Sequence, residues 1–180
     1  MKITQIIDRL RQLTQVNVQQ SWLNTSEDIS PNSMNFEQLE LSQVNEQDYI
    51  IWEAGRKVKW LIQRFIIPKH LNGYPLVGFT LRLSLAWWAE IAEIFVNGNL
   101  VQEGDLFDSS GRILLTSSAQ PGEEFVVALR LVSPNHDIGA LMKSLLVYER
   151  NNNLSDPGFI ADELTILYNY LTAFEPKKLA

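Results

Sequence analysis

The side chains best suited to chemistry in this chain are tryptophans, and two of them are adjacent. Trp87 and Trp88 end a segment in which apolar and polar residues alternate. Neighbouring residues on a strand point to opposite faces of a sheet, so we expect at least one of the two rings to leave the core. An exposed indole ring can cover the C–H face of a sugar. Trp87 and Trp88 are therefore the candidate carbohydrate-binding residues, with a protein interface as the alternative.

The sequence gives weaker support for a metal site or a catalytic site. His70 and His136 have no second ligand at a recognised metal-binding spacing, so we interpret both as solvated loop residues. The segment EGDLFDSSG, residues 103–111, offers carboxylate oxygens for a calcium ion but lacks the EF-hand spacing, which leaves calcium an open alternative. Without cysteine, a phosphate-binding glycine loop or a GxSxG motif, the sequence predicts no catalytic residue and no metal ligand.

Composition excludes several function classes. The net charge of -6 disfavours nucleic acid, because the phosphate backbone attracts clustered Lys and Arg. The absence of cysteine favours a reducing compartment, and we expect a cytoplasmic location. No apolar run approaches the roughly 18 residues that a membrane span needs, so we expect no membrane partner.

The apolar pattern divides the chain into helical ends and a strand-rich middle. Apolar residues recur at helical spacing within residues 3–13, which predicts an amphipathic helix as an N-terminal unit, 1–15. Residues 15–47 lack a sustained period, and we expect an irregular segment with one short strand. The segments 58–62 and 77–85 alternate, so each predicts a strand with one buried face, and Trp60 is expected in the core. The prolines and Asn-Gly of 68–75 predict a loop between them.

Turn residues separate the remaining strands. Asn97 and Gly98 lie between the apolar arms 91–96 and 100–102, which predicts a short hairpin with left-handed turn residues. Residues 112–115, 124–132 and 141–149 are expected to form further strands. Seven or eight short strands without intervening helices predict a mainly β fold, an antiparallel β-sandwich of the jelly-roll type, over residues 16–150.

A second helix is predicted near the C-terminus. Ser155-Asp156-Pro157 is a helix-start signal, an apolar stripe follows it, and Pro176 ends the pattern. A polar Asn-rich linker precedes this helix. We therefore treat 151–180 as a linker and helix that lead toward a further, catalytic region absent from this chain.

The order of these segments resembles a known family. The similarity lies in AEIFVNGNLVQEGDLFD, in ILLTSSAQPGEEFVVALRLVSPNHDIG, in Trp60 with the following FIIPKHL, and in SDPGFIADELTILYNYL. Together they are similar to the N-terminal, galactose-binding-domain-like β-sandwich of family 38 glycoside hydrolases, the cytosolic and vacuolar α-mannosidases. The resemblance spans about residues 45–175.

The resemblance implies a non-catalytic domain. The family's zinc-binding His-x-His-x-Asp motif, its nucleophilic aspartate and its acid/base residue lie beyond the sandwich, and nothing in this chain corresponds to them. Zinc is accordingly expected only in the catalytic region of a parent that hydrolyses terminal α-mannosyl linkages. The implied partners are that catalytic domain, a second copy in a homo-oligomer, and mannosides.

Two hypotheses of other classes stay open. A free-standing carbohydrate-binding module would use Trp87 or Trp88 to stack on a sugar. A small protein-interaction domain would associate through the N-terminal helix.

Overall fold

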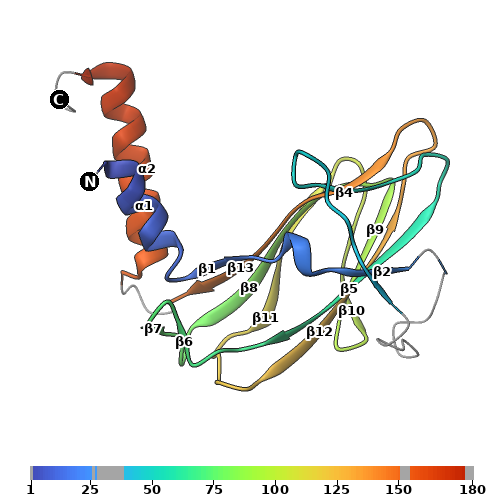
Figure 1. Ribbon diagram of the computed structural model, residues 1–180, viewed down its shortest axis with the longest axis horizontal. Helices are drawn as coiled ribbons and strands as arrows, with labels where there is room; N and C mark the ends of the chain where they lie inside the picture. The colour runs from blue at the N-terminus through green and yellow to red at the C-terminus, as the bar shows by residue number, and fades with distance from the viewer. Residues whose placement is uncertain (1, 26, 28–38, 151–154, 177–180) are drawn as a thin grey trace.

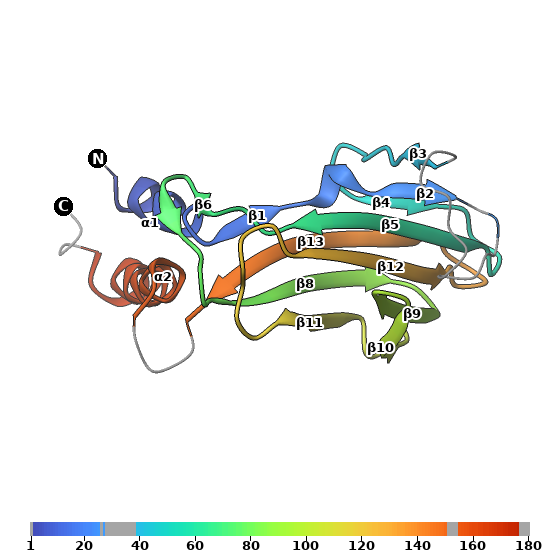
Figure 2. The same ribbon diagram turned by 90° about the horizontal axis from the view of Figure 1, so that it is seen from below.

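The computed structural model describes residues 2–25, 27, 39–150 and 155–176. Its body is a pair of antiparallel sheets, and two helices lie together at one end of that body (Figures 1 and 2). The predicted mainly β sandwich with a helix near each end is thus confirmed. The Asn-rich linker predicted at 151–153 lies outside the described residues.

One sheet has five strands and contains both tryptophans of the candidate site. Its order is β1-β13-β8-β11, with β4 also paired to β13. The strands are β1 (Gln15–Asn17), β4 (Ile50–Trp52), β8 (Thr80–Trp88), β11 (Ser110–Thr116) and β13 (Gly139–Glu149).

The other sheet has six strands in the order β10-β9-β12-β5-β2-β3. The strands are β2 (Leu23–Thr25), β3 (Glu40–Leu41), β5 (Val58–Ile66), β9 (Ile91–Val96), β10 (Asn99–Gly104) and β12 (Glu124–Val132). A separate small hairpin pairs β6 (His70–Leu71) with β7 (Tyr74–Pro75). The segment predicted as a loop at 68–75 is therefore partly a hairpin, turned by Asn72 and Gly73 at positive φ.

The main core lies between the two sheets. Leu83 of β8 and Leu129 of β12 are fully buried and belong to one apolar cluster that draws on both sheets. On β8 the predicted alternation holds, because Leu81, Leu83 and Leu85 are buried while the residues between them are half-buried. Val77, predicted to share that buried face, lies before the strand and is 55% exposed.

Strand β5 departs from the prediction of a single buried face. Leu61 and Phe65 belong to the main core, whereas Trp60 and Ile62 are buried in a second cluster with Ala128. The Trp60 ring packs on Phe95 with ring centroids 5.7 Å apart. Trp60 is thus a buried packing residue, as expected, but on the opposite face from the inter-sheet core.

The N-terminal segment is more ordered than its sequence suggests. Helix α1 (Ile3–Arg11) is followed by β1, by the 3₁₀ turn η1 (Gln19–Ser21) and by β2. β1 pairs with β13 and β2 with β5, so the segment reaches both sheets. The expectation of an irregular stretch with one short strand is wrong, because strands this short show no periodicity and depend on partners far along the chain.

The second helix, α2 (Pro157–Phe174), begins where the sequence predicts. Asp156 is its N-cap, and the Asp156 carboxylate accepts a 2.9 Å hydrogen bond from the backbone N–H of Phe159. α2 lies alongside α1 (Figures 1 and 2), where Arg11 donates to Asp162 at 3.1 Å and to Thr165 at 3.0 Å. Neither described helix combines the length and apolar character needed to cross a membrane.

Candidate functional site

Trp87 is a core residue of the five-stranded sheet. Its side chain is 1% exposed, and its backbone N–H donates to Ser109 O at 2.9 Å in the loop that follows β10. A Cβ atom on Gly104 would lie 2.5 Å from Trp87 Cζ2, so glycine permits this close approach. The buried ring has no face open to a ligand in this structure.

Trp88 points to the outer face of the same sheet, as the alternation of a strand requires, and is half-buried. Its indole Nε1–H donates to Asp137 Oδ2 at 3.1 Å, and Asp137 Oδ1 accepts from the backbone N–H of Ile138 at 2.8 Å. Across the sheet, Trp88 pairs with Ala140, and Ala140 pairs with Ile51 on β4. Directly paired residues share a face, so Trp88, Ala140 and Ile51 form one apolar row, here called the Trp88 row.

The Trp88 row has the chemistry of a sugar platform. Ile51 is 44% exposed and Trp88 is half-buried, so apolar surface reaches solvent beside a carboxylate. Stacking on an aromatic ring and hydrogen bonding to a carboxylate are complementary to the two sides of a pyranose. The role of Trp88 in carbohydrate binding stays a prediction.

The loop of EGDLFDSSG is ordered by Asp105. The Asp105 carboxylate accepts from the backbone N–H groups of Asp108 at 2.9 Å and of Phe107 at 2.7 Å, and these bonds lower the pKa of Asp105 from its ordinary value. Phe107 is left 94% exposed at the tip. No group of three His, Cys, Asp or Glu side chains that could hold a metal ion occurs within the described ranges. Calcium binding at this loop stays a prediction.

The two histidines lie in different segments of the fold, and His136 directly precedes Asp137 in the chain. His70 begins the small β6–β7 hairpin, and His136 lies in the loop between β12 and β13. Both are exposed. Their positions agree with the interpretation as solvated side chains.

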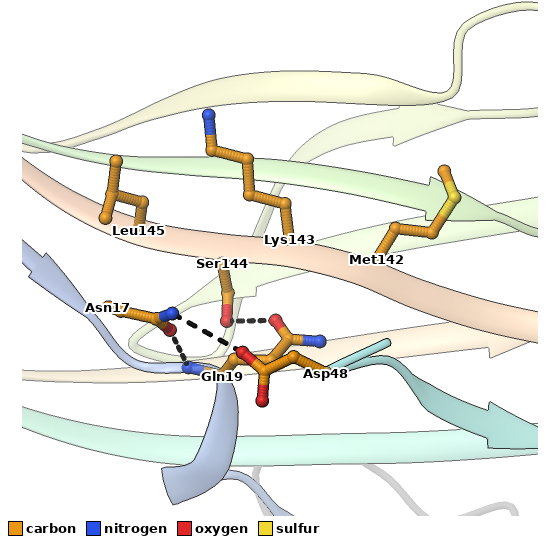
Figure 3. Close-up of a pocket in the computed structure, with 7 residues that line it drawn as sticks. All are labelled: Asn17, Gln19, Asp48, Met142, Lys143, Ser144 and Leu145. Atoms are coloured by element: carbon orange, nitrogen blue, oxygen red, sulfur yellow. Dashed lines mark hydrogen bonds between the residues drawn. The ribbon is translucent and has the colours of Figure 1, made fainter. Parts of the chain in front are cut away.

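A small hollow of about 100 Å³ lies beside β13, lined by polar groups of the N-terminal segment (Figure 3). The Ser144 hydroxyl donates to Gln19 Oε1 at 2.8 Å and accepts from Trp22 Nε1–H at 2.8 Å. Figure 3 shows Ser144 pointing toward Gln19, whereas Lys143 points to the other side of the strand. Because the buried polar groups already bond each other, we interpret this network as an anchor for the N-terminal segment.

Two buried hydroxyl groups, those of Ser144 and Tyr148, are unsuited to nucleophilic catalysis. Ser144 is 2% exposed and its hydroxyl is hydrogen-bonded on both sides, so it cannot approach a substrate as a nucleophile. Burial raises the pKa of Tyr148 to about 12, which keeps its phenol protonated at neutral pH. Neither of these two buried hydroxyls is therefore a candidate nucleophile.

Sequence reasoning missed Asp137 and Ile51 as neighbours of Trp88. Asp137 follows His136 in a loop, and Ile51 lies on a three-residue strand. Ile51 joins the Trp88 row only through β13, which lies between β4 and β8, and Asp137 reaches Trp88 from the loop that leads into β13. No local sequence signal carries that information.

Comparison with known proteins gives a match in structure but none in sequence. No protein-family model matches the chain. No curated protein matches it in sequence either. Among solved structures, it is similar to Bacteroides uniformis beta-glucuronidase 2, with a TM-score of 0.55 and 14% identity over 82% of this chain and 19% of that one. It is also similar to a glycosyl hydrolase family 2 member from Bacteroides cellulosilyticus DSM 14838, with a TM-score of 0.53 and 16% identity over 76% of this chain and 21% of that one.

These matches correct the family resemblance. The similar structures are family 2 and beta-glucuronidase chains, so the family 38 α-mannosidase assignment is wrong. A V-N-G hairpin and the order of strands follow from the sandwich topology, and unrelated enzymes share such a topology. The zinc and mannoside expectations rested on that assignment and lose their basis. At this identity the likeness establishes the β-sandwich fold, and the chain spans about a fifth of the length of the two structures.

Proposed function

We propose that this chain is a non-catalytic β-sandwich domain that accompanies the catalytic domain of a glycoside hydrolase. The observation that carries the proposal is the similarity of its fold to a fifth of a beta-glucuronidase chain at a TM-score of 0.55. Most of such an enzyme lies outside the matching part. An accessory domain in this position packs on the neighbouring domains of the enzyme and shapes access to the enzyme's active site.

The proposal accords with the chemistry of the described residues. The buried Ser144 hydroxyl is committed to two structural hydrogen bonds, and no cluster of metal-binding side chains occurs among the described residues. The partner is then a catalytic domain of the same polypeptide or complex. The predicted location stays the cytoplasm, on the basis of the cysteine-free composition.

The mass and activity of the native polypeptide test this proposal. We expect the native protein to be several times heavier than 20.6 kDa and to hydrolyse aryl glycosides, a β-glucuronide among them. The 180-residue chain alone should hydrolyse none of the same panel. A native mass of 20.6 kDa with no bound glycosidase would contradict the proposal, as would hydrolysis by the isolated chain.

A second candidate is a carbohydrate-binding module, and the Trp88 row is the observation that favours it. The indole of Trp88 and the carboxylate of Asp137 lie together at the surface, joined by a 3.1 Å hydrogen bond. A sugar that stacks on Trp88 can donate a hydroxyl hydrogen bond to the same carboxylate. This function is compatible with the first, because an accessory sandwich can hold substrate near a catalytic domain.

A further inference from the structure

The side of α2 that faces away from α1 is apolar and exposed. Six large side chains of this helix are 41–72% exposed, whereas Ala161 is buried and Thr165, one turn further on, bonds Arg11 of α1. These six exposed side chains, together with Glu163, are here called the α2 stripe. Its members are Phe159, Ile160, Glu163, Ile166, Leu167, Tyr170 and Phe174.

The spacing of the α2 stripe is that of a helix interface. Phe159, Glu163, Ile166, Tyr170 and Phe174 follow one another at steps of three or four residues, which places them on one face of the helix. Tyr170 and Phe174 already pack together, with ring centroids 5.1 Å apart. A helix that is apolar both toward α1 and away from it normally packs on both sides.

Glu163 restricts what can cover this face. The four positions three and four residues away from it, Phe159, Ile160, Ile166 and Leu167, are all apolar. An occupant that removes water from these side chains also removes it from the carboxylate. That cost is offset only if the occupant donates a hydrogen bond to Glu163.

A second copy of α2 meets this requirement in one register. We propose that the α2 stripe is a homodimer interface in which two α2 helices pack antiparallel about a twofold axis between Ile166 and Leu167. In this register Phe159 lies opposite Phe174 of the other copy, and Ile166 lies opposite Leu167. Glu163 lies opposite Tyr170, whose hydroxyl is the hydrogen-bond donor that the carboxylate needs.

The charges of α2 fit the same register. Asp162 falls opposite the position of Leu171, and Glu175 falls opposite Gly158, in the first turn of the other helix. No carboxylate faces another carboxylate. An acidic residue near a helix N-terminus is favourable, as is the antiparallel arrangement of two helix dipoles.

The exposed area of the α2 stripe is also large enough for a dimer interface. From their exposed fractions, the six apolar side chains of the α2 stripe present roughly 700 Å² to solvent. A standard interface buries about 800 Å² per partner, so the stripe and its rim suffice for a specific dimer. The inference does not depend on the glycosidase proposal, because it uses only contacts within this chain.

Sedimentation equilibrium of the 180-residue chain tests the dimer. We expect the average mass to rise from 20.6 kDa toward twice that value between about 1 and about 100 µM. Ile166→Glu puts a carboxylate at the axis and should weaken dimerisation at least ~10-fold. The matched control is Thr172→Glu, which adds the same charge at an exposed position three or four residues from no member of the α2 stripe and should leave the dimer unchanged.

A disulfide experiment tests the register. The chain has no cysteine, so Glu163→Cys combined with Tyr170→Cys introduces the only thiols. Seven residues of helix separate them by about 10 Å, too far for a bond within one copy. Oxidation should therefore yield a covalent dimer, and the control pair Asp162→Cys with Asn169→Cys should yield much less. A monomer at the highest concentration, or equal cross-linking by both pairs, would overturn the proposal.

Discussion

Trp88 carries the carbohydrate-binding prediction because its ring lies at the surface of the five-stranded sheet beside Asp137. If a sugar stacks there, Trp88→Ala should abolish binding measured by calorimetry, since one stacked ring contributes much of the affinity of a small ligand. Saturation is expected at millimolar concentrations or below. The titration should include mannose and glucuronic acid.

Phe107→Ala provides the control for that measurement. Phe107 is another aromatic side chain and is 94% exposed, but it lies in the loop after β10 rather than on the Trp88 row. Its removal should leave sugar binding intact. If neither the unmodified chain nor the Phe107→Ala variant binds any sugar of the panel, Trp88 is not a carbohydrate platform.

At the scale of elements, the β9–β10 hairpin is set by its two-residue turn. Asn97 and Gly98 have φ values of 50° and 79°, the left-handed pair that suits a tight hairpin. The turn is also tied to β12, because Asn97 N–H donates to Val126 O at 2.8 Å and Asn97 Oδ1 accepts from Val126 N–H at 2.9 Å. The turn thereby fixes the register of an edge hairpin on the sheet.

Gly98→Val should destabilise the protein, because a β-branched residue is strained at positive φ. We expect the free energy of unfolding in urea to fall by about 1–3 kcal/mol. Asn99→Val places the same side chain one residue later, on β10 and outside the left-handed region, and should cost much less. Equal stability of the two variants would contradict this role for Gly98.

At the scale of the whole molecule, the N-terminal segment is joined to the last strand through buried hydrogen bonds. Ser144 of β13 bonds Gln19 and Trp22, while Gln19 Nε2–H donates to Leu141 O at 2.6 Å. All three side chains are at most 2% exposed. These bonds connect residues more than 120 positions apart, so they join the N-terminal segment to the last strand of the sandwich.

Ser144→Ala should therefore lower the free energy of unfolding, because it leaves the buried Trp22 indole N–H and the Gln19 amide oxygen without a partner. An unpaired buried polar group costs about 1–3 kcal/mol. Ser84→Ala is the control, since Ser84 is half-buried on the outer face of β8. Urea denaturation should separate the two variants, and equal midpoints would show that the network does not stabilise the fold.

Part of the architecture is determined by local sequence. The period of two in 80–88 and the Asn-Gly turn at 97–98 specify a strand and a hairpin without reference to distant residues, because backbone geometry alone sets them. The start of α2 at Asp156-Pro157 is likewise local, since the capping bond spans three residues. From such signals the sandwich with two terminal helices is predictable.

Only the tertiary structure decides which surfaces are available. Trp87 continues the alternating series of Leu83 and Leu85, but only the position of the second sheet decides that this face is buried and that Trp88 faces outward. The strands β1 to β3 and the neighbours Ile51 and Asp137 depend on pairings between distant segments. α2 has apolar residues on two sides, and α1 covers only one of them. Local propensity fixes the elements, whereas burial depends on which elements meet, and that is a property of the folded chain as a whole.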